Sequence, residues 1–212
     1  MSEKVQLFIL FFPVFLFSLT FHECAHAWRA ARSGDPTAKM LGRLTLNPLV
    51  HMDLLGTFLL PLLTFLSPGI GIPIAGWAKP VPITPVNFRD PRWDAVKVAA
   101  VGPAANLLLS LIFSAVLYGI YWLSPGLLSG VVYSLLRIGV YVNLGLAFFN
   151  LIPLHPLDGG KVMEGLLPDR YLISYNQVAH YGILIIFVAY YLGFMKILWI
   201  PVRFLAGILI PI

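Results

Sequence analysis

The chain has 212 residues, of which 59% are hydrophobic and only 11% are charged, and its mean hydropathy is +0.87. A soluble core of this size could not bury so much apolar surface, so the composition indicates an integral membrane protein. The net charge of +5 does not indicate a nucleic-acid partner. The basic residues lie in short loops beside apolar runs, where membrane orientation explains them. A single cysteine, Cys24, excludes an intrachain disulfide framework.

Four apolar segments are long enough to span a hydrocarbon core of about 30 Å. They are residues 5–28, 95–123, 128–152 and 178–198. The first is longer than the apolar region of a cleaved signal peptide and lacks a small-residue cleavage site, so we expect it to remain in the mature chain.

Two further segments do not fit a simple span. Residues 54–74 are apolar but are interrupted by Pro61 and by Ser67-Pro68-Gly69, so their longest uninterrupted pieces are too short to cross. Residues 76–82 contain prolines and β-branched residues that favour an extended segment. We therefore expect an all-α polytopic membrane protein with about four to six transmembrane helices, a re-entrant segment and a short extended (β) edge segment. It should form a single domain over residues 1–212.

The end of the first apolar segment carries an HExxH motif, His22-Glu23-Cys24-Ala25-His26. A helix places residues i and i+4 on one face, so His22 and His26 can bind one metal ion while Glu23 flanks it. A carboxylate in an apolar segment is expensive unless it has a partner, which strengthens the metal interpretation. Cys24 is expected to be a small apolar filler.

Two histidines supply only part of a zinc site, since a catalytic zinc usually has three protein ligands. Asp158 is the strongest candidate for the third, because its carboxylate ends an apolar segment where prolines and glycines break the helix. His155 and His51 compete for this role, and Asp53 is a weaker candidate. Asp158 has an alternative role as the N-cap of a following helix, and the two roles are compatible.

Several motifs resemble the site-2 protease family of intramembrane zinc metalloproteases, and more narrowly its compact prokaryotic members without PDZ or CBS domains. The motifs are HECAHA (22–27), GRLTLNPLVHMDLLGT (42–57), GWAKPVP (76–82), GPAAN (102–106) and NLIPLHPLDGG (150–160). This resemblance implies one Zn²⁺ held by His22, His26 and Asp158, with Glu23 as catalytic base. It also implies that Asn150 helps to hold the substrate. Residues 76–82, among them Gly76, Trp77, Ala78, Lys79 and Pro80, would then line the cleft as an edge strand.

The polar residues around this set have open roles. Asn106, Asn150 and Asp53 are candidates for a water path to the metal, and His51 remains a possible neighbour of the ligands. His155 departs from the family pattern, where many relatives carry a smaller or apolar residue. Its position between two prolines leaves open a contact with metal or substrate.

A parity argument constrains the topology. Glu23 and Asp158 both end apolar segments, so they meet only if an even number of crossings separates them. Residues 54–74 should therefore enter and leave on one side, as a re-entrant hairpin broken at residues 67–71. The loops on the metal side then carry ten Lys and Arg residues against three on the other side. The positive-inside rule places the metal near the cytoplasmic face of a prokaryotic cell membrane, with the N-terminus outside.

The sequence thus predicts a zinc endopeptidase that cleaves a transmembrane protein substrate in or next to its membrane helix. Zinc-bound water is the nucleophile and Glu23 the general base. The alternatives are an inactive scaffold that binds transmembrane helices and a zinc transporter or sensor. A transporter would need ligands along a path across the bilayer, and a scaffold would not need Glu23.

Overall fold

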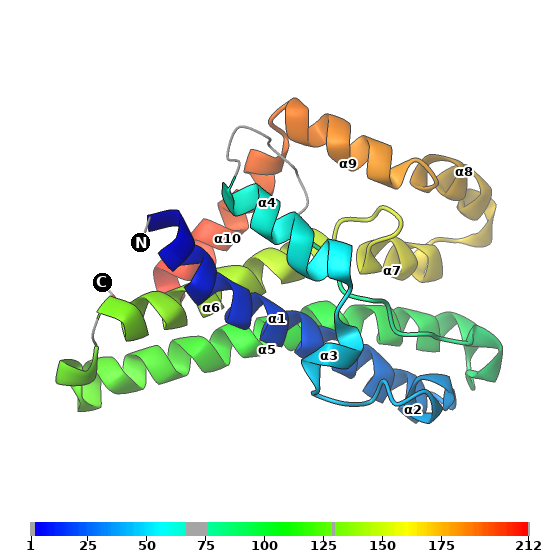
Figure 1. The fold of residues 1–212 in the computed structure, drawn as a ribbon. Coiled ribbons are helices and arrows are strands. Elements are labelled where there is room, and N and C mark those ends of the chain that lie inside the picture. The colour runs from blue at the N-terminus through cyan, green and yellow to red at the C-terminus, as the bar shows by residue number, and fades with distance from the viewer. Residues whose placement is uncertain (1–2, 67–75, 129, 212) are drawn as a thin grey trace.

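A computed structural model describes residues 3–66, 76–128 and 130–211. Within these ranges the chain is helical, with turns and irregular connections and no β-strand, which confirms the expected all-α class (Figure 1). Three helices are long and apolar enough to cross a membrane, or four if one bent pair counts as a single span. The fold is that of a polytopic membrane protein.

The three long helices run alternately across the molecule. They are α1 (Glu3–Arg32), α5 (Pro91–Leu123) and α6 (Gly130–Asn150). On α1 and α5, His26 contacts Val98 while Ser18, two turns earlier, contacts Asn106, so these helices are antiparallel. Helix α6 returns along α5, and in Figure 1 the metal-side end of α1 lies beside the start of α5. This is the arrangement that the parity argument requires.

The connection between α1 and α5 returns to the side on which α1 ends. It contains the short helices α2 (Thr37–Met40) and α3 (Pro48–His51), the π-helix η1 (Leu54–Leu59), α4 (Leu60–Leu66) and the 3₁₀ turn η2 (Pro85–Asn87). Together η1 and α4 form a short apolar helical stretch below spanning length. The predicted break of a re-entrant hairpin at residues 67–71 lies outside the described residues.

A buried carboxylate fixes this connection to the end of α1. Asp35 accepts hydrogen bonds from the Thr37 and Thr84 backbone amides, the Thr37 hydroxyl and the Asn87 amide. Burial raises the pKa of Asp35, but these hydrogen bonds, with those from Asn87 and Thr37 first, hold its pKa below the ordinary value. The ionised carboxylate thereby holds residues 84–87 against the end of α1.

The C-terminal region differs from the single span predicted at residues 178–198. The 3₁₀ turn η3 (Pro125–Leu127) precedes α6, and α7 (Asp158–Leu166), α8 (Asp169–Ala179), α9 (Gly182–Tyr191) and α10 (Met195–Leu209) follow it. Helices α8 and α9 form the bent pair, at 59°, and Gly193 has a φ of +79° between α9 and α10. A left-handed glycine ends a helix, so the predicted span is wrong as a continuous helix. Helix α9 alone, at roughly 15 Å, is also too short to cross.

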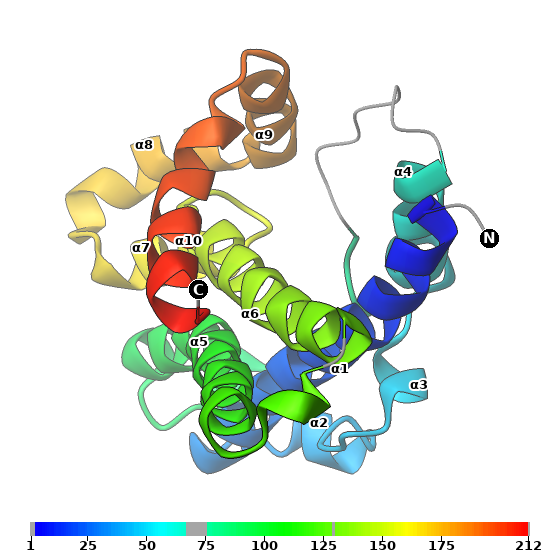
Figure 2. The same cartoon turned by 90° about the vertical axis from the view of Figure 1, so that its left-hand side faces the viewer.

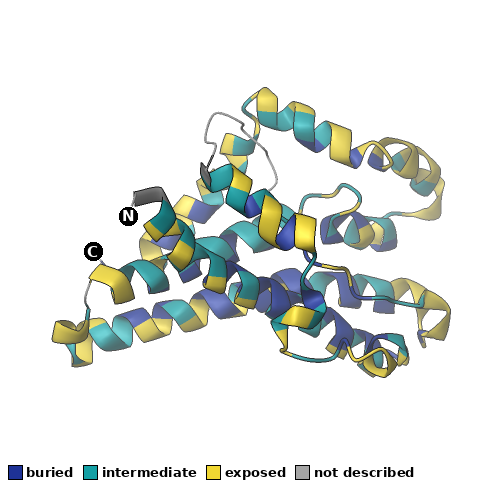
Figure 3. Cartoon of the chain, in the orientation of Figure 1, coloured by how far each residue is buried: buried dark blue, intermediate teal, exposed yellow. Residues whose placement is uncertain are grey.

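Buried residues gather where α1, α5 and α6 meet, whereas the outer faces of the helices carry many exposed large apolar side chains (Figure 3). One buried cluster joins Phe15 and Leu19 of α1 to Ala78, and another joins Val140 and Leu144 of α6 to α10. Apolar side chains on the outside suit a hydrocarbon solvent. The polar interior, by contrast, contains the histidines and asparagines of the site described next.

Candidate metal centre

The second half of α1 presents both histidines of the HExxH motif to the protein interior. His22 and His26 are buried, with exposures of 5% and 6%, and their ring centres lie 4.6 Å apart. Their Nε2 atoms are separated by 3.0 Å, as the one-turn spacing on a helix predicts.

Each histidine ring is oriented by a hydrogen bond at its other nitrogen. Nδ1 of His22 lies 2.6 Å from Oδ1 of Asn106, and Nδ1 of His26 lies 2.6 Å from the Val98 carbonyl oxygen. Both partners are acceptors, so each Nδ1 carries a proton and donates it, and in the neutral ring Nε2 is left with its lone pair. This is the tautomer that binds a metal through Nε2.

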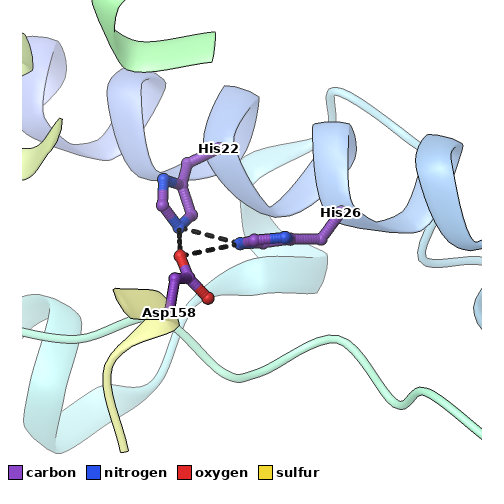
Figure 4. Close-up of side chains that lie close together, drawn as sticks. All are labelled: His22, His26 and Asp158. Atoms are coloured by element: carbon purple, nitrogen blue, oxygen red, sulfur yellow. Dashed lines mark hydrogen bonds and ion pairs between the residues drawn. The ribbon is translucent and has the colours of Figure 1, made fainter. Parts of the chain in front are cut away.

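Asp158 completes the group from the far end of the chain (Figure 4). Its Oδ2 lies 3.1 Å from Nε2 of His22 and 3.2 Å from Nε2 of His26. Two ligands bound to a tetrahedral zinc at 2.0–2.1 Å lie roughly 3.3 Å apart. The three ligand atoms therefore have nearly the spacing of three corners of a zinc tetrahedron, and the geometry brings together the three residues that the sequence predicted.

The donor set itself fits a cation. In the neutral tautomers, two nitrogen lone pairs and a carboxylate oxygen face one another with no proton between them, which is repulsive unless a positive charge lies at the centre. A metal ion would supply that charge. Burial raises the pKa of Asp158, but its contacts with His22 and His26 outweigh burial and hold the pKa below the ordinary value. The ionised carboxylate is the form that binds a metal.

Asp158 reaches the histidines from the first residue of α7. The N-cap position belongs to Leu157, and no side chain caps this helix, so the alternative role of Asp158 as an N-cap is wrong. The Tyr175 hydroxyl lies 3.1 Å from the carbonyl oxygens of both Pro153 and Gly160, and so contacts the loop on both sides of Asp158. A Cβ at Gly159 would lie 2.4 Å from the Leu151 carbonyl oxygen, which shows how tightly this loop folds back.

A buried network of polar side chains lies behind the histidines. Asn106 donates to the Ser18 carbonyl and to Oδ1 of Asn143, while Asn143 donates to the Ser18 hydroxyl. These contacts join α1, α5 and α6 in one buried network behind His22. Asn106 was a candidate neighbour of the site, whereas Asn143 and Ser18 were not predicted, because neither belongs to a recognisable metal motif.

Gly102 of α5 is a further unpredicted contributor. A Cβ at this position would lie 2.3 Å from Nε2 of His26 and 2.6 Å from Cε1 of His22. Only glycine lets α5 approach the imidazole rings this closely. The local signal was the GPAAN motif, which indicated a resemblance but no contact.

The remaining candidates have their described contacts elsewhere. His51 is buried, with Nε2 bonded to the Thr45 carbonyl, and Asp53 caps η1 at the Gly56 amide. His155 pairs with Glu164 at 3.2 Å. None of the three belongs to the group of ligand atoms, so the alternatives of His51, His155 or Asp53 as third ligand are wrong.

Asn150 and the extended segment are placed differently. Asn150 ends α6 and donates to the Leu146 carbonyl, so the structure gives it no contact with a ligand atom, and its role in holding substrate stays a prediction. Residues 76–84 follow an extended path without a strand partner (Figure 1). Within this segment, the Val81 amide donates to Oε2 of Glu23 at 3.1 Å. The predicted edge segment therefore contacts the predicted base.

An HExxH helix and a distant aspartate that converge on one point, inside a bundle of apolar helices, define a membrane-embedded metallopeptidase centre. Comparison with known proteins agrees. A model of peptidase family M50 matches residues 127–194. Over 178 residues the chain is 39% identical to "Putative zinc metalloprotease YwhC" of Bacillus subtilis (strain 168), covering 82% of this chain and 76% of that protein.

A second relative is Rip2 of Mycolicibacterium smegmatis (strain ATCC 700084 / mc(2)155), whose name carries the same description. The two chains are 31% identical over 184 residues, which cover 87% of this chain and 67% of Rip2. No solved structure matches the chain. The chain therefore belongs to peptidase family M50, the site-2 protease family, and is a metalloprotease, as its motifs predicted.

Proposed function

We propose that the chain uses one zinc ion, held by His22, His26 and Asp158, to hydrolyse a peptide bond in or next to a transmembrane helix of a membrane-protein substrate. The observation that carries this proposal is the contact between Glu23 and residues 76–84 beside the three ligand atoms. It joins a base, a metal site and a backbone-binding segment in one place.

Glu23 is suited to the role of general base. Its Oε2 accepts the Val81 amide, while Oε1 has no hydrogen-bond partner in the part of the chain that the structure describes. A zinc ion here would lower the pKa of a coordinated water toward about 7 and polarise the scissile carbonyl. Glu23 would accept the proton of the attacking water at Oε1 and transfer it to the leaving amine.

Residues 76–84 are suited to binding an unwound substrate. The amides of Trp77 and Lys79 donate to the Gly56 and His51 carbonyls, so these alternate amides point into the protein. In an extended chain the intervening amides point the other way. The Ala78 amide has no partner among the described residues. A substrate strand placed along this edge would replace hydrogen bonds lost when its helix unwinds.

The same proposal places the metal near the cytoplasmic face of a cell membrane. The metal-side loops contain most of the cationic residues, which the positive-inside rule assigns to the cytoplasm. Among the described residues, one group has the spacing to hold a metal ion. A single metal site at one depth supports a hydrolase over a transporter, and Glu23 beside it supports a hydrolase over a scaffold.

The test is cleavage of single-span substrates by purified protein in liposomes. Glu23→Gln should lower the cleavage rate by at least about 100-fold, the usual range for loss of a general base, while one equivalent of zinc stays bound. Glu3→Gln, at the other end of α1, is the matched control and should cleave normally. Persistent cleavage by Glu23→Gln would refute the role of Glu23. Zinc binding with no cleavage of any substrate would favour the scaffold.

A further inference from the structure

A large apolar cavity lies between α6 and its neighbours. It has a volume of about 600 Å³, and its lining includes Phe11 and Phe15 of α1, Trp199 and Val202 of α10, and Gly76 at the start of the extended segment. Figure 2 shows α6 between α10 on one side and α1 with α4 on the other. The α6 wall is a single helical face that begins at Ser134 and ends at Phe149.

One charged side chain lies in this apolar lining. Arg137 is exposed, and its guanidinium lies 5.8 Å from the ring centre of Tyr141, one turn along the same face. It has no acidic partner among the side chains that the structure describes. An unpaired cation within a membrane is expensive and is retained where a partner of opposite charge is supplied.

The position of Arg137 relative to the metal follows from the helix contacts. Asn143 of α6 bonds to Ser18 of α1, and His22 lies four residues further toward the metal side on α1. The metal is therefore level with about residue 147 of α6. Arg137 lies ten residues before that level, roughly 15 Å along the helix axis.

Building on the proposed function, we propose that Arg137 determines substrate specificity by binding a carboxylate side chain of the substrate's transmembrane segment. The segment occupies the apolar cavity. The carboxylate lies about ten residues from the cleaved bond, to within one helical turn of that position, on the side away from the metal. A guanidinium binds a carboxylate through two parallel hydrogen bonds, and this pairing is strong where water is scarce. An Asp or Glu at this substrate position pairs with Arg137, whereas a neutral residue leaves Arg137 unpaired.

The test compares paired substrates that differ only at this position. Single-span peptides carrying Glu or Gln ten residues from the cleaved bond are presented in neutral phosphatidylcholine liposomes. The wild-type protein should cleave the Glu peptide with a kcat/KM at least tenfold higher. Arg137→Gln should lose that preference, and Arg137→Glu should prefer a Lys peptide. Arg203→Gln is the matched control, because Arg203 is exposed on α10 and does not line the cavity.

Three results would overturn the proposal. The first is an unchanged Glu preference in Arg137→Gln. The second is an Arg137→Gln defect that is equal for both peptides and appears only when anionic phosphatidylglycerol is present, which would assign Arg137 to a lipid headgroup. The third is a Glu preference that is absent in the wild-type protein and present in Glu3→Gln, which would show that a carboxylate of the chain itself, and not one of the substrate, pairs with Arg137.

A binding assay separates this proposal from the proposed function. Affinities of the same peptides are measured by fluorescence anisotropy with the Glu23→Gln protein, which needs no cleavage. A Glu preference in binding, without cleavage by the wild type, would uphold Arg137 and refute the protease. Cleavage without any charge preference in rate or binding would uphold the protease and refute the role of Arg137.

Discussion

Substituting Gly102 by alanine should weaken metal binding more than it changes the rest of the fold. The added Cβ would lie 2.3 Å from Nε2 of His26, whereas ordinary contacts begin at 3.4 Å, so one partner must move by roughly 1.1 Å. Metal ligands tolerate displacements of only about 0.5 Å. We expect zinc affinity to fall at least about 100-fold, which corresponds to about 2.8 kcal/mol.

The assay is competition for zinc with a chromophoric chelator, using the purified protein in detergent. Gly119→Ala on the same helix is the matched control, because a Cβ there meets nothing within 4 Å. It should bind zinc normally and, with alanine's better helix propensity, unfold at an equal or higher temperature. Affinity is the deciding measurement, since alanine before Pro103 also disfavours helix by itself. Wild-type zinc affinity in Gly102→Ala would refute the reasoning.

Two further predictions concern the supports of the site. Asn106→Leu removes the acceptor at Nδ1 of His22 and should lower zinc affinity about 10- to 100-fold, as loss of a ligand's orienting partner usually does. Asn176→Leu, at an exposed position on α8, should leave the affinity unchanged, and equal affinities in the two variants would contradict the role of Asn106. Asp35→Asn should lower unfolding stability at pH 7 by about 2–4 kcal/mol, because a buried hydrogen-bonded carboxylate is lost. The folded-state pKa of Asp35 is depressed, so its stabilisation is present above the ordinary value of 3.8 and is lost as the pH falls through the folded value. The unfolding temperatures of the wild type and of Asp35→Asn should therefore converge in acid. A constant difference between them down to pH 3 would be evidence against this role of Asp35.

The sequence singled out the candidate base and the third candidate ligand because a carboxylate in an apolar segment has a local cost that a cation can offset. Glu23 between two histidines, and Asp158 after a helix-breaking run, are expensive in a membrane without a cation. The parity of the crossings then followed from the need for both to meet. These arguments use side-chain chemistry and segment length, which a single sequence contains.

The residues that sequence reasoning missed act through tertiary contact. Gly102 matters because α5 approaches His26, and Asn143 matters because α6 lies beside Ser18. The GPAAN motif that contains Gly102 indicated a family resemblance but no contact, and nothing local distinguishes Asn143 from other asparagines in apolar helices. The same holds for His51, whose sequence position allowed a ligand role until its ring was found bonded to the Thr45 carbonyl. The break after α9 depends on the left-handed conformation of Gly193, which the apolar pattern does not encode.

The buried amide network explains how a site of two distant halves keeps its geometry in a bilayer. Lipid tails are as apolar as the side chains between helices, so apolar burial alone does little to fix how one membrane helix slides against another. The hydrogen bonds of Asn106 to Ser18 and Asn143 set the register of α1, α5 and α6, and the same Asn106 orients His22. Asp158 follows α6 in the chain. The register of α6 therefore also sets the position of Asp158 along the helix axes, relative to His22 and His26. Metal geometry and helix register are therefore held by the same residues, and a substitution in the network should disturb both together.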